Sequence, residues 1–331
     1  MAQAWGGGGF FDWMLSRGFA RRPWCRRGNV GCWVLDVLPR KPFLVGALLI
    51  IGLAAHAEDF PDITTVAPDL TVPEMTTGAP EAGKRVRYTT PGWDGTEVYG
   101  ALFLPVDWKA GGRYPVIVEW AGNGDFHDAF GDVSTGVVEG SRLGYGVTEG
   151  KGCIWICVPY LNNAGTANVI KWWGDPPSFD PEPTLKYCRA TVQNVCEKFG
   201  GDPRRVVLAG FSRGSIADNY LGLHDDATAA LWRGFICYSH YDGARTNWPY
   251  PRADRASALE RLQRLKGRPQ FICGERSNAA ETERYLRETG SWDKGTFTVV
   301  GTGFRNHNDA WTLRPSEART KLREWWRAIV K

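Results

Sequence analysis

The chain has 331 residues, of which 43% are hydrophobic and 23% are charged. This balance excludes an intrinsically disordered protein and is sufficient for one substantial hydrophobic core. Residues 1–57 contain seven Lys or Arg and two Asp, so the rest of the chain, with 33 basic and 34 acidic residues, has a net charge of −1. That charge gives no reason to expect binding to nucleic acid or to an acidic membrane surface.

A leader is expected over residues 1–57. Residues 43–55 form an uninterrupted apolar run of 13 residues, which Arg40 and Lys41 precede and the small-residue segment 55–57 follows. A transmembrane helix needs about 20 apolar residues, so the run is typical of a secretory signal peptide cleaved after Ala57. We therefore expect a periplasmic or secreted protein with no stable membrane insertion after cleavage. Residues 1–36, rich in Gly and Arg, suggest a misplaced start codon.

Residues 58–84 are rich in Pro, Thr and acidic residues without periodicity, which predicts an extended lead-in. The domain, residues 85–331, is expected to open with a hairpin over 85–90 and 97–105. Predicted strands follow at 114–120, 153–159, 205–209, 235–238, 269–273 and 297–300. Predicted helices lie at 184–199, 215–223, 256–265, 279–289 and 316–330. This alternation predicts an α/β domain with a mainly parallel central sheet covered by helices on both faces.

Ser212 is the strongest candidate for a catalytic residue. It lies at the centre of Gly210-Phe211-Ser212-Arg213-Gly214, between the apolar run 206–209 and a helical run that begins at 215. GxSxG in this context predicts a nucleophile on a sharp strand-to-helix turn. The backbone N–H of Arg213 then faces an oxyanion, and the guanidinium of the same residue is a further charge expected nearby. A turn without chemical function is the alternative.

The order of strands, helices and GxSxG turn resembles the α/β-hydrolases, in the group that contains acetylxylan-esterase-like and prolyl-oligopeptidase-like enzymes. The segment 199–212, with its Gly-Asp-Pro turn and following strand, is similar to the lead into that family's nucleophile. The resemblance covers residues 85 to 331. It implies a cofactor-free serine hydrolase with a Ser-His-acid triad and an acyl-enzyme, in which the acid and then the base follow the serine in the chain.

His307, between the last predicted strand and the final helix, occupies the place that this resemblance gives to the base. His240 is expected at the pocket wall. The acid has two candidates, because Ser277 stands where the family usually has aspartate. Glu275 is preferred, since its longer side chain recovers the reach lost by lying two residues earlier, and Asp242 is the alternative.

Backbone and aromatic groups complete the expected site. The turn 121–124 predicts a second oxyanion donor, the backbone N–H of Asn123. Aromatic residues in loops at the carboxyl ends of strands are expected to contact substrate, with simple loop packing as the alternative. These candidates are Trp172, Trp173, His240, Tyr241 and Trp248. No cysteine has neighbours at zinc-ligand spacing, so no metal site is expected.

The expected function is an exported serine hydrolase that cleaves carboxylic esters, including acyl groups on carbohydrate. A prolyl-oligopeptidase-like serine peptidase is the alternative within the same class. A non-catalytic carbohydrate-binding protein on a hydrolase scaffold is the alternative from another class, because the usual aspartate is missing at Ser277. A small-molecule or carbohydrate ester is therefore the expected partner.

Overall fold

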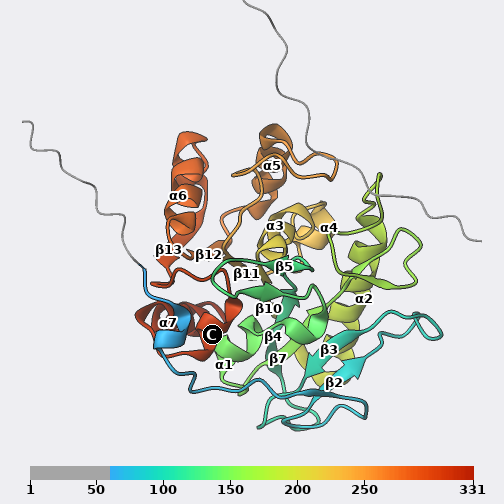
Figure 1. The fold of residues 1–331 in the computed structure, drawn as a ribbon. Helices are drawn as coiled ribbons and strands as arrows, with labels where there is room; N and C mark the ends of the chain where they lie inside the picture. Colours follow the sequence, from blue (N-terminus) through green and yellow to red (C-terminus); the bar gives the residue numbers. More distant parts are fainter. Residues whose placement is uncertain (1–59) are drawn as a thin grey trace, which may run out of the picture. The chain divides into compact units, whose positions relative to one another are not determined.

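A computed structural model describes residues 60–331, so the predicted leader lies outside the described residues. Nine strands form one sheet in the order β1-β2-β3-β7-β4-β10-β11-β12-β13 (Figure 1). These strands are β1 (Met75–Thr76), β2 (Arg85–Tyr88), β3 (Gly100–Phe103), β4 (Tyr114–Trp120), β7 (Ile154–Val158), β10 (Gly201–Phe211), β11 (Gly234–Tyr238), β12 (Pro269–Gly274) and β13 (Thr296–Gly301). The neighbours from β7 to β13 are all parallel, and β3 is antiparallel to β2 and β7. The predicted opening hairpin and mainly parallel sheet are confirmed.

Helices cover both faces of the sheet, as expected. They are α1 (Leu143–Thr148), α2 (Glu182–Phe199), α3 (Arg213–Tyr220), α4 (Asp226–Ala229), α5 (Arg255–Leu262), α6 (Asn278–Glu288) and α7 (Glu317–Ile329). Alternate strand residues face opposite sides because the side-chain period of a strand is two. Val206 and Leu208 of β10 pack with α2 and α3 in one apolar cluster, whereas Val207 and Ala209 pack with α1 and α7 in another.

The loops contain short hairpins and 3-10 helices that were not predicted from the sequence. β5 (Phe126–His127) pairs with β6 (Val133–Ser134), and β8 (Tyr160–Leu161) pairs with β9 (Asn168–Val169). The 3-10 helices of residues 60–331 are η1 (Ile63–Thr65), η2 (Val138–Gly140), η3 (Gln263–Leu265), η4 (Trp292–Lys294) and η5 (Asp309–Leu313). Along the chain, the β5–β6 hairpin lies between β4 and β7, and the β8–β9 hairpin lies between β7 and β10.

The described part of the expected lead-in is anchored to the rest of the domain. Asp62 forms an ion pair with Arg305 at 2.8 Å, and Ile63 is buried while its N–H donates to Asn306 Oδ1 at 2.7 Å. Asp69 pairs with Arg319 of α7. These contacts bring the lead-in against the segment that follows β13, next to His307.

The carboxylate of Glu119 joins α1 to the centre of the sheet. Its Oε1 accepts the N–H groups of Arg142 and Leu143, both at 3.2 Å. Its Oε2 accepts the Gly144 N–H at 2.8 Å and Trp155 Nε1–H at 2.7 Å. Glu119 is fully buried, and burial raises its pKa to about 7. The side chain therefore satisfies four donors that have lost their contact with water.

Replacing Glu119 with Gln is expected to destabilise the fold. An amide has only one acceptor oxygen, so its NH2 group would face two of the four donors, at a cost of about 2–4 kcal/mol in the free energy of unfolding. Urea denaturation measures the change. Glu324→Gln, on the exposed side of α7, is the matched control and should change stability by less than about 0.5 kcal/mol. Equal stability of the two variants would contradict this role of Glu119.

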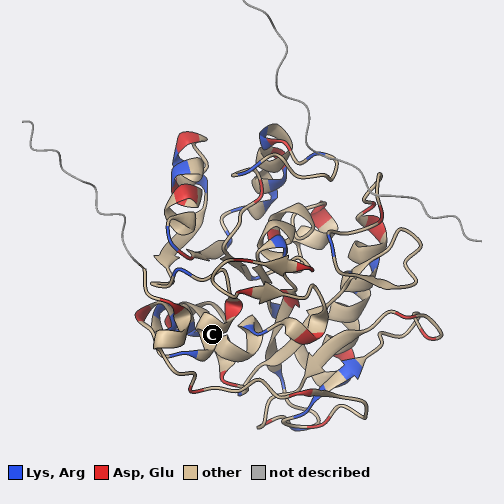
Figure 2. Ribbon diagram, in the orientation of Figure 1, with Lys and Arg blue, Asp and Glu red and all other residues tan. Residues whose placement is uncertain are grey.

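Charged residues of both signs occur along helices α5 and α6, whereas the central strands are mostly uncharged (Figure 2). Within residues 60–331, no helix is both long enough and apolar enough to cross a bilayer.

Candidate active site

The carboxyl ends of four neighbouring parallel strands bring the candidate residues together. Phe211 of β10 is paired with Tyr238 of β11, and Tyr238 is paired with Cys273 of β12. Ser212 and Ser239 directly follow two of these strand ends, and Glu275 directly follows β12. His307 follows β13, the fourth strand in this series. Side chains from one edge of the sheet can therefore meet, which is where α/β folds place ligands.

Ser212 lies on a strained turn between β10 and α3. Its backbone has φ 56° and ψ −113°, a conformation that L-residues rarely adopt and that is typical of functional sites. At the two glycine positions of the motif, neighbouring backbone atoms leave no room for a side chain. A Cβ on Gly210 would lie 2.1 Å from the Gly214 carbonyl carbon, and one on Gly214 would lie 2.2 Å from the Trp120 carbonyl oxygen. The GxSxG spacing therefore permits a turn that larger residues would block.

Ser212, His307 and Glu275 form one hydrogen-bonded series. Ser212 Oγ lies 2.9 Å from His307 Nε2, and His307 Nδ1 lies 2.7 Å from Glu275 Oε1. With the imidazole proton on Nδ1, the ring donates to the carboxylate and accepts from the hydroxyl. The structure thus joins three predicted residues with the geometry needed for a general base to activate a serine.

The structure places Glu275, and not Asp242, beside the imidazole. Burial raises the pKa of Glu275, but the hydrogen bond and charge of His307 outweigh it and hold that pKa below its ordinary value. The Asp242 carboxylate instead binds Arg261 through both oxygens, at 2.8 and 3.1 Å, in a buried ion pair. The alternative assignment of the acid to Asp242 is therefore not supported. Ser277, in the usual aspartate position, is exposed and donates to Glu281 at 2.7 Å.

Two polar residues that the sequence analysis missed also bind the Glu275 carboxylate. Ser239 Oγ lies 3.0 Å from both Glu275 Oε1 and His307 Nδ1, and Asn278 Nδ2 donates to the same Oε1 at 2.7 Å. Glu275 Oε2 is buried with no hydrogen-bond partner within residues 60–331. Asn278 lies three residues after Glu275, at the start of α6, a spacing that could have indicated the contact. Ser239 follows a strand end, as Ser212 does.

Aromatic rings surround the imidazole of His307. The Phe211, Phe126 and His240 ring centroids lie 4.8, 5.0 and 5.3 Å from its centroid. Burial, His307 and Arg245 lower the pKa of His240 to about 3, so this ring is neutral at ordinary pH. His240 is thus placed at the wall of the site, as expected, and it has no hydrogen bond to Ser212 among the described residues.

The two candidate oxyanion donors lie on adjoining segments. Neither the Arg213 N–H nor the Asn123 N–H has a protein acceptor within residues 60–331. The Arg213 guanidinium is held by protein groups, and its expected influence on an oxyanion stays a prediction. It donates to the Gly122 carbonyl at 2.7 Å and lies 3.9 Å from the centre of the Tyr160 ring. This buried side chain ties the elbow to the turn that carries Asn123.

The five aromatic candidates separate into two groups. Trp172, Trp248 and His240 are half-buried, and the Trp248 ring lies 5.2 Å from Trp172 and 5.8 Å from His240. Trp173 and Tyr241 form the buried group, and their contact with substrate stays a prediction, although Tyr241 also lines a small cavity beside His240 and Trp248. Trp173 is fully buried and stacks on Tyr220 at 4.5 Å, and Tyr241 is buried with its hydroxyl bonded to Gln270.

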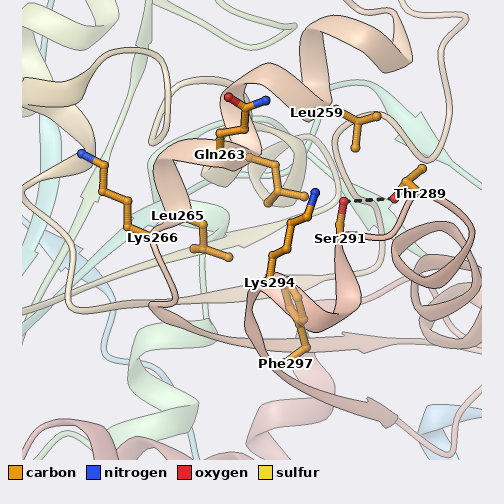
Figure 3. A pocket seen from close by; sticks show the side chains of 9 residues that line it. Leu259, Gln263, Leu265, Lys266, Thr289, Ser291, Lys294 and Phe297 are labelled. Carbon is orange, nitrogen blue, oxygen red and sulfur yellow. Dashed lines mark hydrogen bonds between the residues drawn. The ribbon is translucent and has the colours of Figure 1, made fainter.

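The larger of two cavities near α5 and α6 lies away from Ser212, His307 and Glu275. It has a volume of about 350 Å³, lies between η3 and the amino end of β13, and is lined by Leu265, Lys294 and Phe297 (Figure 3). His307 follows the opposite, carboxyl end of β13. A smaller cavity of about 50 Å³ does adjoin the candidate site, with Ser239, His240, Trp248 and Asn278 in its wall. In residues 60–331, no group of three or more His, Cys, Asp or Glu is placed to hold a metal ion.

A mainly parallel sheet with a serine on the sharp turn after a central strand, and a histidine beyond the last strand, is the α/β-hydrolase fold. No protein-family model and no curated protein matches the chain. Similar solved structures include the AtxE2 isopeptidase, a thermostable esterase from Pseudomonas putida and the dipeptidyl peptidase 4 of Porphyromonas gingivalis.

These structures share little sequence with the chain. The isopeptidase matches 75% of it at 15% identity and a TM-score of 0.48, over 40% of its own length. The esterase matches 81% at 17% identity and a TM-score of 0.46, over 87% of its own length. The dipeptidyl peptidase matches 75% at 13% identity and a TM-score of 0.48, over 36% of its own length. The chain therefore spans less than half of the isopeptidase and of the dipeptidyl peptidase.

Proposed function

We propose that this protein is a serine hydrolase that cleaves carboxylic esters through an acyl-enzyme on Ser212. The observation that carries the proposal is the unbroken series of short contacts from Ser212 Oγ through the His307 ring to the buried Glu275 carboxylate. A hydroxyl is a weak nucleophile at neutral pH, and an adjacent base held in place by a carboxylate is the general way to activate it.

The proposed reaction begins when Ser212 Oγ attacks the ester carbon and its proton passes to His307 Nε2. The negative charge that develops on the ester oxygen is stabilised by the backbone N–H groups of Arg213 and Asn123. His307 then returns the proton to the departing alcohol, which leaves the acyl group on Ser212. Water activated by the same imidazole releases the acid and restores the serine. Glu275 stabilises the imidazolium in both half-reactions.

We also propose that the alcohol or acyl part of the substrate carries a flat apolar face, as a sugar or an aromatic acid does. Half-buried rings extend from the imidazole to the surface, from His307 to His240 at 5.3 Å, to Trp248 at 5.8 Å and to Trp172 at 5.2 Å. Such faces stack well on sugar C–H groups and on aromatic rings. An acylated carbohydrate outside the cytoplasm suits both these rings and the signal-peptide pattern of residues 43–57.

Substrate screening tests the reaction class. The purified protein without its leader would be assayed on short aryl esters, acetylated sugars and feruloyl esters, and on peptide anilides of matched acyl part. We expect a higher kcat/KM for the esters. Faster cleavage of the anilides would support the peptidase alternative instead, and sugar binding without turnover of any substrate would support the non-catalytic alternative.

Replacing Trp248 with Ala is expected to raise KM about 5- to 20-fold for feruloyl or sugar esters, because one stacking face of about 1–2 kcal/mol is lost. The kcat should change little, since the ring does not touch the reacting atoms. Trp292→Ala is the matched control, because this half-buried ring packs on Phe297 near the amino end of β13, opposite the end that His307 follows. An unchanged KM in Trp248→Ala would remove the ring from the binding site.

A further inference from the structure

One buried carboxylate outside the catalytic series organises the loop that carries His307. Asp132 lies in the loop between β5 and β6 and is 2% exposed. Its Oδ2 accepts the backbone N–H of His307 at 2.8 Å. Its Oδ1 accepts the side-chain amides of Asn306 at 3.2 Å and of Asn308 at 3.1 Å. Three consecutive residues thus donate to a single side chain that precedes them by about 175 positions.

The backbone of Asp132 is itself held by its own hairpin loop. Asp128 Oδ1 accepts the backbone N–H of Asp132 at 3.0 Å and that of Phe130 at 2.9 Å. The Asp128 N–H donates in turn to the Asp132 carbonyl at 3.2 Å. At the start of the same hairpin, the Phe126 ring meets the imidazole edge to face at 5.0 Å. The hairpin therefore contacts His307 at two places, its backbone and its ring.

The segment that carries His307 depends on such contacts. It lies between β13 and η5, outside any helix or strand. Asn306 fixes it on one side, because its Oδ1 accepts the Ile63 N–H while its Nδ2 reaches Asp132. Tyr238 of β11 also holds this segment. Its hydroxyl donates to the Asn306 carbonyl at 3.2 Å and accepts the Asn308 N–H at 3.2 Å. Among these contacts, only that of Asp132 is to the backbone of His307 itself.

We propose that Asp132 is a positioning residue, which holds the His307 backbone so that the imidazole stays aligned between Ser212 and Glu275. This inference rests on the proposed function, because alignment of that ring affects rate only if Ser212 is the nucleophile. A ring displaced by about 1 Å loses up to two orders of magnitude in rate, although the displacing residue never touches substrate. Loop-borne catalytic groups need this kind of support from a rigid neighbour.

The test compares Asp132→Asn with Asp125→Asn. Asp132→Asn keeps the shape of the side chain but replaces one of its two acceptor oxygens with an NH2 group. The donors to Asp132 are divided between both oxygens, so at least one N–H would face the NH2 group. Asp125→Asn removes the same charge from the segment just before β5, at a side chain that is 68% exposed and, within residues 60–331, forms an ion pair with Lys171 alone. We expect kcat on a short aryl ester to fall about 10- to 100-fold in Asp132→Asn, with KM within about threefold of wild type. Asp125→Asn should retain kcat within about twofold.

A spectroscopic measurement separates this proposal from the proposed function. The low-field proton resonance of the His307 Nδ1–H hydrogen bond to Glu275 reports ring alignment without any substrate. It should shift or broaden in Asp132→Asn and stay unchanged in Asp125→Asn. If wild type shows the resonance but hydrolyses nothing, the proposed function fails and the resonance alone decides the role of Asp132. An unchanged resonance in a folded Asp132→Asn, or a kcat within twofold of wild type, would overturn the proposal.

Discussion

Ser212→Ala is expected to lower kcat for ester hydrolysis by about 10⁴- to 10⁶-fold, because the alanine cannot form the acyl-enzyme. The fold should be unaffected, since the only hydrogen bond of the serine hydroxyl among the described residues is to His307. His307→Ala should be nearly as inactive, and the double variant should be no worse than either single one, because the two groups act as a unit.

Steady-state kinetics on an aryl ester, with thermal melting of each variant, measures this expectation. Additive losses in the double variant would show that Ser212 and His307 act separately, contrary to their 2.9 Å contact. Residual activity above about one per cent in Ser212→Ala would point to a different nucleophile.

Glu275→Gln is expected to lower kcat by about 10³- to 10⁴-fold while the protein stays folded. The amide would present either a donor to the Nδ1–H of His307 or an oxygen that stabilises the imidazolium less well, so the ring would favour the wrong tautomer. With the amide oxygen in the place of Oε1, Ser239 and Asn278 keep their acceptor and the side chain stays in place.

Asp242→Asn is the matched comparison. It should lower stability and leave kcat nearly unchanged, whereas Glu275→Gln should lower kcat and leave the protein folded. Removing the charge from the buried pair with Arg261 leaves a guanidinium without its anion, at a cost of about 3–5 kcal/mol in stability. Molecules that remain folded should keep a kcat near that of wild type. Urea denaturation and kinetics on the same preparations measure both quantities. A large loss of kcat in Asp242→Asn, with little loss in Glu275→Gln, would contradict the acid assignment.

Much of this fold can be predicted from the sequence because the patterns that indicate it lie within short segments. Short apolar runs form the strands that precede Ser212 and Glu275, and a helix begins soon after each of these residues. GxSxG has a steric cause within five residues, since Gly210 and Gly214 lie against each other across the turn. The position of His307 after the last strand follows from the order of strands in such a sheet.

The remainder depends on contacts between distant segments. Glu275 and Asp242 both follow strand ends, so the sequence does not distinguish them as candidates for the acid. In the structure Asp242 binds Arg261, whereas Glu275 lies beside His307. Trp173 and Trp172 are adjacent in the chain, yet one is buried and the other half-exposed, because Trp172 has φ 48° and the chain turns between the two rings. Asp132 carries no local signal, since its partners follow it by about 175 residues.

The central claim is that Ser212 is a nucleophile activated by His307, and covalent labelling tests it most directly. Wild-type protein and Ser212→Ala would be incubated with a fluorophosphonate probe, and the site of the adduct located by peptide mass spectrometry. The expected result is one adduct per wild-type chain, on Ser212, and none on the variant. Folded wild-type protein that stays unlabelled, or that carries the adduct on another residue, would contradict the claim.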